Sequence, residues 1–149
     1  MNESSVHGAT CPRAAVGVLL VDAHERVLLT LRKRPPEAGS WSIVGGKLDF
    51  LEPLEKCAIR EAREEVGVEI AIDALLCITD HRLPLEGQHW VSPAFLGHIL
   101  SGQAKNCEPQ KTTDVRWFAL GELPANLTMT ARNAISAYAI HKHLTHRSH

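Results

Sequence analysis

Three glutamates in one short segment have the clearest potential for chemistry. Glu61, Glu64 and Glu65 stand at positions i, i+3 and i+4, which are neighbours on one face of a helix, with Cβ atoms roughly 5–6 Å apart. Carboxylates that lie this close repel one another and raise each other's pKa. Magnesium prefers oxygen ligands and binds through a few carboxylates together with substrate phosphates. The spacing therefore favours a divalent-cation site that a phosphate-bearing ligand completes.

A solvated, charged helix face is the simpler explanation for a run of glutamates and arginines, because such faces are common on exposed helices. Two features favour the metal site here. Gly45 and Gly46 precede the helix, and exposed glycine backbone can approach a phosphate or a metal ion closely. The spacing of the glutamates is also longer and more particular than a charge run requires.

The same segment resembles the Nudix box. That box is a glycine, five residues, a glutamate, seven residues, Arg-Glu, an apolar residue, any residue, Glu-Glu, any residue, a glycine and an apolar residue. Its positions are met by Gly46, Glu52, Arg60, Glu61, Ala62, Glu64, Glu65, Gly67 and Val68. The flanks also resemble the family, so the likeness covers about residues 13–140. Two positions depart from the usual pattern, Val44 where proline is common and Leu51 where glycine is usual.

The resemblance implies a Nudix-type α/β/α sandwich with a central mixed β-sheet, and hydrolysis of a nucleoside diphosphate linked to another group. It implies that Glu61, Glu64 and Glu65 bind magnesium, or manganese as an alternative, and that the carbonyl of Gly46 or Gly45 joins them. Arg60 would orient the glutamates, and Glu52 would support the loop before the helix.

The resemblance also implies a general base, for which Glu64 or Glu65 is the first candidate. Some relatives take the base from a later loop. Here that loop offers Glu108, which we favour, and Asp114, nearer the next strand. Glu108 is also a candidate metal ligand.

Substrate contacts are predicted from residue type. Arg32 and Arg34 end a predicted strand near the expected phosphates, and the planar guanidinium binds two phosphate oxygens at once. Trp90 and Phe118 are candidates to stack on a base, although either ring would serve equally in the core. His89 is a candidate to hydrogen-bond a base edge.

Among Nudix proteins, the chain looks most like the MutT-type enzymes that convert a nucleoside triphosphate to a monophosphate and pyrophosphate. Such a role would be housekeeping of the nucleotide pool. An ADP-ribose or nucleotide-sugar pyrophosphatase is the alternative. A non-catalytic nucleotide-binding module is disfavoured because such modules usually lose glutamates of the box, whereas Glu52, Glu61, Glu64 and Glu65 are all present.

Periodicity predicts the elements that position these residues. Residues 14–21 read as a buried strand with residues 26–31 as its hairpin partner, and residues 41–44 as a short apolar segment. A helix begins at Pro53 and ends before Gly67. Strands are predicted over 68–79, with an interruption near Asp73, and over 90–100 and 114–120. A second helix over 129–144 has Thr128 or Thr130 as its N-cap.

Length and composition restrict the class of protein. The 149 residues suit one domain, expected over residues 13–145 between an N-terminal arm (1–12) and a tail (146–149). A net charge of −1 argues against nucleic-acid partners, and the apolar run at 14–21 is too short to span a membrane. Four cysteines without a CxxC pair indicate a reducing, cytoplasmic location. The expected partner is a small nucleotide, bound by a monomer or homodimer.

Overall fold

The computed structural model of the chain describes residues 11–147, which form two β-sheets and two α-helices. The four-stranded sheet has the order β4-β1-β6-β5, with β1 and β6 parallel and the other pairs antiparallel. The three-stranded sheet, β3-β2-β7, is antiparallel. In chain order the elements are β1 (Arg13–Leu20), β2 (Val27–Arg32), β3 (Trp41–Ser42), β4 (Val44–Lys47), α2 (Leu54–Val66), β5 (Glu69–Leu83), β6 (Gln88–Ser101), β7 (Thr112–Phe118), the 3-10 turn η1 (Leu120–Glu122) and α3 (Met129–His146).

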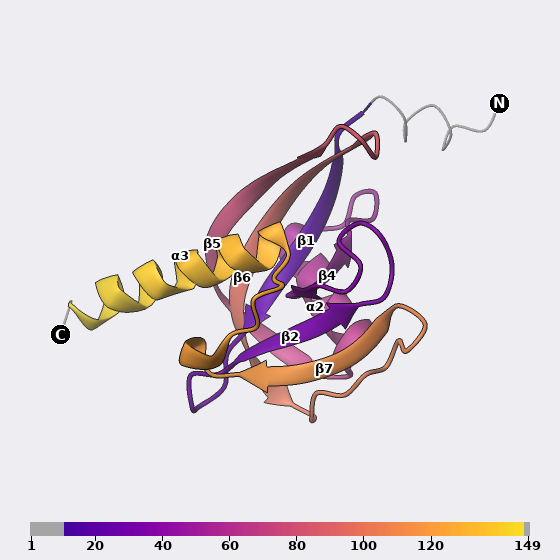
Figure 1. Ribbon diagram of the computed structural model, residues 1–149. Helices are drawn as coiled ribbons and strands as arrows, with labels where there is room; N and C mark the ends of the chain where they lie inside the picture. Colours follow the sequence, from indigo (N-terminus) through magenta and orange to yellow (C-terminus); the bar gives the residue numbers. More distant parts are fainter. Residues whose placement is uncertain (1–10, 148–149) are drawn as a thin grey trace.

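Each face of the four-stranded sheet packs against a helix, so the molecule has two apolar cores. Val16 and Val18 of β1 pack with Ala58 and Ala62 of α2 in one core. The opposite face of β1 and β6 packs against α3 in the other core. Its members include Leu19, Ala94, Ala131 and Ile135. Figure 1 shows α3 running across β5 and β6, with its C-terminal end extending past the sheet. This arrangement confirms the predicted α/β/α sandwich and its mixed sheet.

Helix α2 has the boundaries that its sequence predicts, to within one residue. Pro53 is the N-cap, with φ −63° and ψ 144°, and the first helical residue is Leu54. Gly67 ends the helix in the left-handed region, with φ 73°, and its N–H bonds to the carbonyl of Arg63 at 3.1 Å. Glycine adopts this conformation without the steric cost that a side chain adds. These two ends fix which helix face carries the glutamates.

The predicted hairpin of residues 14–21 and 26–31 is wrong. Both edges of β1 are occupied, one by β4 and the other by β6, so β2 cannot pair along it. Only an isolated bridge joins Val21 to Val27, and β2 belongs to the three-stranded sheet. The predicted segment 41–44 is also divided, because β3 and β4 lie in different sheets with Ile43 between them.

Strands β5 and β6 and helix α3 continue beyond their predicted ends, whereas β7 begins and ends two residues earlier than predicted. The interruption near Asp73 is a shift in the register of β5 against β6 between Ile72 and Ala74. Thr128, not Thr130, is the N-cap of α3, because its hydroxyl accepts the N–H of Ala131 at 3.2 Å. The predicted arm and tail fall largely on residues 1–10 and 148–149, outside the described residues, so the domain division stays a prediction. Within residues 11–147, no helix has the length and apolar character to cross a membrane.

Candidate functional site

A cleft of about 570 Å³ lies between the two sheets and collects side chains from every layer. Strands β1 and β6 contribute several small residues to its lining, including Ala15, Gly17 and Ala94. The three-stranded sheet contributes a wall through Thr30 and Ser42. Helix α2, the first turn of α3 and the loop after β2 close its ends, so segments far apart in the sequence meet around one volume.

The carboxylates of Glu61 and Glu65 reach this cleft across the edge of β4. One oxygen of Glu65 accepts the N–H of Gly45 at 3.0 Å. The carboxylate of Glu61 lies against Gly46 so closely that a Cβ on that residue would stand 2.5 Å from Oε1. A side chain at position 46 would therefore displace the Glu61 carboxylate from this place. Glu108, from the loop before β7, lines the same cleft.

These carboxylates lie in an environment that opposes their negative charge. Burial raises the pKa of Glu65 to about 7, against the opposing effect of the Gly45 hydrogen bond, and the charge of Glu61 raises it further. Burial also raises the pKa of Glu61, which the charge of Arg60 opposes and that of Glu64 reinforces. The mutual repulsion that the spacing predicts is therefore present in the folded chain.

Arg60 holds the segment before α2 against the helix. Its Nε and Nη2 donate to the two oxygens of Glu52 at 2.8 and 2.9 Å, which is a bidentate pair. That hydrogen bonding lowers the pKa of Glu52 to about 2. Nη1 donates to Glu61 at 2.9 Å and to Glu64 at 3.1 Å. Neither Arg60 nor Glu52 lines the cleft, so Arg60 contacts Glu61 and Glu64 from outside it.

The donors of this site fit a hard divalent cation. Glu61, Glu65 and Glu108 supply only oxygen atoms, and Gly46 leaves open the backbone beside them. The charge of Glu108 raises the pKa of Glu61, and the charges of Glu61 and Glu108 raise the pKa of Glu65. Glu64 differs, because its half-exposed side chain turns to Arg60 and does not line the cleft. Within residues 11–147, no three acidic, histidine or cysteine side chains are gathered as a ready metal cluster.

The predicted arginines occupy different positions. Arg34 lines the cleft. Arg32 also lines it, but its guanidinium holds the loop after β2, with Nε donating to the carbonyl of Pro36 at 2.8 Å and Nη2 to that of Arg34 at 3.3 Å. Lys111 lies at the cleft beside Glu108, 3.3 Å away.

The predicted aromatic pair is divided by the fold. Trp90 lines the cleft, with the guanidinium of Arg13 over its ring at 4.2 Å and its Nε1 donating to Gln88 at 2.9 Å. Phe118 lies elsewhere, packed edge-on against Trp41 at 4.9 Å in the core under α3. It is absent from the cleft lining, so the geometry does not support the expected contact with a base.

Two further candidates also lie outside the cleft lining. Asp114 pairs with Arg116 at 2.7 Å, and His89 contacts Asp80 at 2.7 Å. Of the two acids proposed as a later base, only Glu108 shares the cleft with the glutamates of α2.

The NUDIX domain matches this sequence over residues 12–138. The chain belongs to the Nudix family. The structure resembles that of a MutT NUDIX hydrolase from Burkholderia pseudomallei, with a TM-score of 0.78 and 44% sequence identity, over 85% of this chain and 97% of that chain. A Bacillus subtilis protein provisionally named 8-oxo-dGTP diphosphatase is 28% identical over 81% of this chain and 76% of its own length.

A third Nudix relative is an NAD-capped RNA hydrolase from Stutzerimonas stutzeri, 29% identical over 91% of this chain. The chain spans 46% of the length of that relative. Together with the intact box, these matches make the chain a Nudix hydrolase, an enzyme that cleaves a diphosphate linkage in a nucleotide and uses divalent cations.

Sequence reasoning missed the part of this Nudix cleft that does not belong to the box. Arg13, Glu37 and His81 all line it, yet each is an isolated residue of a different segment. Arg13 and Trp90 are register partners of β1 and β6, and Trp90 and His81 are partners of β6 and β5. These three residues become neighbours only when β1, β6 and β5 pair. The alternation of polar and apolar residues within one strand therefore cannot predict that they meet.

Proposed function

We propose that the chain is a magnesium-dependent nucleoside triphosphate pyrophosphohydrolase, which adds water to a triphosphate and releases a nucleoside monophosphate and pyrophosphate. The observation that carries this proposal is that acidic and basic side chains line the same cleft. The acids Glu61, Glu65 and Glu108 share it with the cations Arg34 and Lys111. Acids alone suit a metal ion, and acids beside cations suit a metal ion together with a phosphate chain.

Each residue has a task that follows from its position. A bound divalent cation supplies neutralisation of phosphate charge, and Glu61 and Glu65, with Glu108, are the side chains that would hold it. Arg34 and Lys111 donate to phosphate oxygens, and Arg60 keeps Glu61 in place through a hydrogen bond of 2.9 Å. Glu65 is our candidate for the general base, because the resemblance to the family favours an acid of α2 and its carboxylate lies in the cleft, where it accepts the N–H of Gly45 at 3.0 Å.

The named relatives support this substrate class. The provisional 8-oxo-dGTP diphosphatase and the MutT hydrolase are similar over most of their own lengths. The NAD-capped RNA hydrolase matches over about half of its length, so its activity is a weaker guide to this chain. A cytoplasmic location and the oligomeric state stay predictions.

The test is a product assay in magnesium and in manganese on the purified chain. It covers the canonical nucleoside triphosphates, 8-oxo-dGTP, ADP-ribose, a nucleotide sugar and NAD. We expect pyrophosphate and a monophosphate from at least one triphosphate. Glu65→Gln should lower kcat by about a hundredfold or more, as removal of a general base does. Glu55→Gln removes an exposed acid from the same helix and should change kcat by less than about twofold.

Two results would overturn the proposal. Cleavage of ADP-ribose, the sugar or NAD with all triphosphates intact would assign the cleft to dinucleotide-type substrates. A folded, metal-loaded chain without activity on any of these compounds would indicate a binding module instead of an enzyme.

A further inference from the structure

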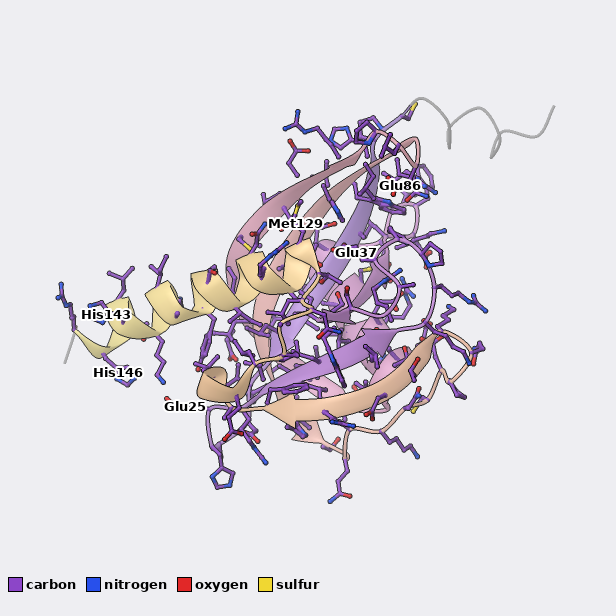
Figure 2. All side chains as sticks on the ribbon, in the orientation of Figure 1. Glu25, Glu37, Glu86, Met129, His143 and His146 are labelled. Carbon is purple, nitrogen blue, oxygen red and sulfur yellow. The ribbon has the colours of Figure 1, made fainter. Side chains whose placement is uncertain are left out.

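A second polar cluster lies in the cleft, contributed by segments that hold none of the Nudix box. Glu37 comes from the loop between β2 and β3, in a left-handed conformation with φ 59°. Its Oε2 accepts the N–H of Met129, the first residue of α3, at 3.1 Å. Figure 2 shows Glu37 beside this first turn of α3, whereas His143 and His146 lie at the other end of the helix. The N-terminus of α3 therefore holds the carboxylate that the loop supplies.

His81 lies next to this carboxylate and is almost fully buried, with 6% of its surface exposed. The separation between its Nε2 and Oε1 of Glu37 is 3.6 Å, too long for a hydrogen bond. Among residues 11–147, no group donates a hydrogen bond to Oε1. Since the side chain of Glu37 is 27% exposed and lines the cleft, Oε1 is an open acceptor for a ligand.

This acceptor does not suit the phosphate part of a nucleotide. An ionised carboxylate has no proton to donate and repels phosphate oxygens. Glu37 also stands on the loop after β2, whereas the acids of the metal site stand on α2 and the loop before β7. The cleft lining also includes the small residues Ala15, Gly17 and Ala94, which leave room for a flat ring system. The part of the ligand that meets Glu37 is therefore not anionic and carries hydrogen-bond donors.

Among the standard bases, guanine presents two neighbouring N–H donors on one edge, its N1–H and its 2-amino group. Adenine and cytosine place an amino group beside an unprotonated ring nitrogen, and thymine places one N–H between two carbonyls. Each oxygen of a carboxylate has two acceptor positions, so Oε2 of Glu37 can accept a second N–H beside that of Met129. Together with Oε1 it can accept two parallel N–H bonds, as a carboxylate does from arginine. We propose that Glu37 binds the N1–H and 2-amino edge of a guanine-type base, with His81 as the buried neighbour that positions it. This inference rests on the proposed nucleotide hydrolysis and names its base class.

The test compares two ligands and two proteins. Hypoxanthine differs from guanine only by lacking the 2-amino group, so the pairs dGTP with dITP and dGMP with dIMP isolate one hydrogen bond. Glu37→Gln keeps an oxygen for the Met129 N–H but replaces the second oxygen with an amino group, so it separates base recognition from loop anchoring. We measure kcat/KM for the triphosphates in magnesium and Kd for the monophosphates by calorimetry without metal.

We expect the wild-type protein to prefer each guanine ligand by about tenfold, the value of one hydrogen bond to a charged group. In Glu37→Gln this preference should fall to about twofold or less. The matched control is Glu25→Gln, because Glu25 also has a positive φ of 61° and also contacts α3, through Lys142, but does not line the cleft. Figure 2 shows Glu25 well away from Glu37. The control should keep the full preference.

The outcomes separate this inference from the proposed function. Equal binding of dGMP and dIMP by the wild type, or an equal loss for both ligands in Glu37→Gln, would overturn the inference and leave Glu37 as an anchor of the loop. In either case triphosphate hydrolysis would stand. A preference for dGMP that Glu37→Gln removes, in a protein that cleaves no triphosphate, would support the base site and overturn the hydrolytic proposal.

Discussion

At the scale of single residues, Glu65 has two properties that work against each other. Its side chain is 8% exposed, which helps to pack α2 against the sheet, yet it carries a carboxylate whose charged form is poorly stabilised there. Burial raises its pKa to about 7 from 4.5. A group that is costly to ionise lowers the stability of the fold at the pH at which it is needed, so the site and the fold make opposite demands on this residue.

The metal-free protein should therefore lose stability as pH rises. Between the unfolded pKa of 4.5 and the folded pKa of about 7, the folded state binds more protons than the unfolded state, so the free energy of unfolding falls with pH. The full difference is about 3 kcal/mol. Glu65→Gln should remove this decline and be more stable than the wild type at pH 8, in spite of its expected loss of kcat.

Urea unfolding in EDTA at pH 5 and pH 8 measures the effect. Glu55→Gln, which removes an exposed acid from the same helix, should follow the wild type. Parallel pH profiles for the wild type and Glu65→Gln would contradict the assignment of this decline to Glu65.

At the scale of elements, the loop between β4 and α2 contains a residue that its backbone disfavours. Leu51 has φ 64° and is 84% exposed, so its side chain gains little packing in exchange for a left-handed conformation. That conformation costs an L-residue about 1–2 kcal/mol, and glycine avoids it at the expense of a more flexible unfolded chain. The loop therefore keeps the shape that a glycine would favour, in spite of the leucine.

Leu51→Gly should accordingly stabilise the protein by about 0.5–1 kcal/mol, which raises Tm by about 1–4 °C for a chain of this size. Differential scanning calorimetry measures the change. Phe50→Gly is the control, because Phe50 is 92% exposed and its φ is not positive, so that change should not raise Tm. A lower Tm for Leu51→Gly would show that the leucine makes a stabilising contact.

The N-terminus of α3 depends on Thr128, which is 2% exposed. Its hydroxyl accepts the N–H of Ala131 at 3.2 Å and donates to Ser42 at 3.0 Å, which ties the helix to β3. Thr128→Ala should lower the free energy of unfolding by about 1–2 kcal/mol. Thr128→Ser retains the hydroxyl and should recover most of this loss. Chemical denaturation of both variants provides the comparison, and equal losses would assign the effect to packing of the methyl group.

The elements that the sequence predicts well are those with local signals. Helix α2 has Pro53 at one end, Gly67 at the other and apolar residues at helical spacing, all within its own segment. The wrongly predicted hairpin of β1 and β2 has no comparable local signal. Two apolar strands joined by a short turn can pair with each other or enter different sheets. Only the pairing of β1 with β4 and β6 excludes the hairpin.

The site shows the same division between local and distant information. The glutamates of α2 are predictable because one helix fixes their spacing. Trp90 and Phe118 have the same appearance in sequence, and only the sheet in which each lies separates a cleft residue from a core residue. Glu37 and His81 meet at 3.6 Å from segments with no shared motif, so no pattern in the chain links them.

At the scale of the whole molecule, the two apolar cores hold the layers together without a metal ion. Each core consists of apolar side chains, one under α2 and one under α3. We therefore expect the cation to serve chemistry and contribute modestly to stability, by about 2.7 kcal/mol when its concentration is a hundred times its Kd.

Metal removal tests this separation. EDTA should abolish hydrolysis, leave the far-UV circular dichroism spectrum unchanged, and lower Tm by only several degrees. Restoring magnesium should restore activity in full. Loss of the circular dichroism signal in EDTA would show instead that the cation is needed for folding.

The short connection from β3 to β4 limits the size of the ligands that this cleft can bind. Ser42 and Val44 belong to different sheets and are separated by Ile43 alone. Two peptide units reach no farther than roughly 7 Å, so at this point the walls cannot move apart to admit a bulkier group. The loop between Arg32 and Trp41 carries no such restriction, because its ends lie in one sheet. Any broadening of substrate range during evolution should therefore appear as changes in the length of that loop, with the spacing from Ser42 to Gly45 left unaltered.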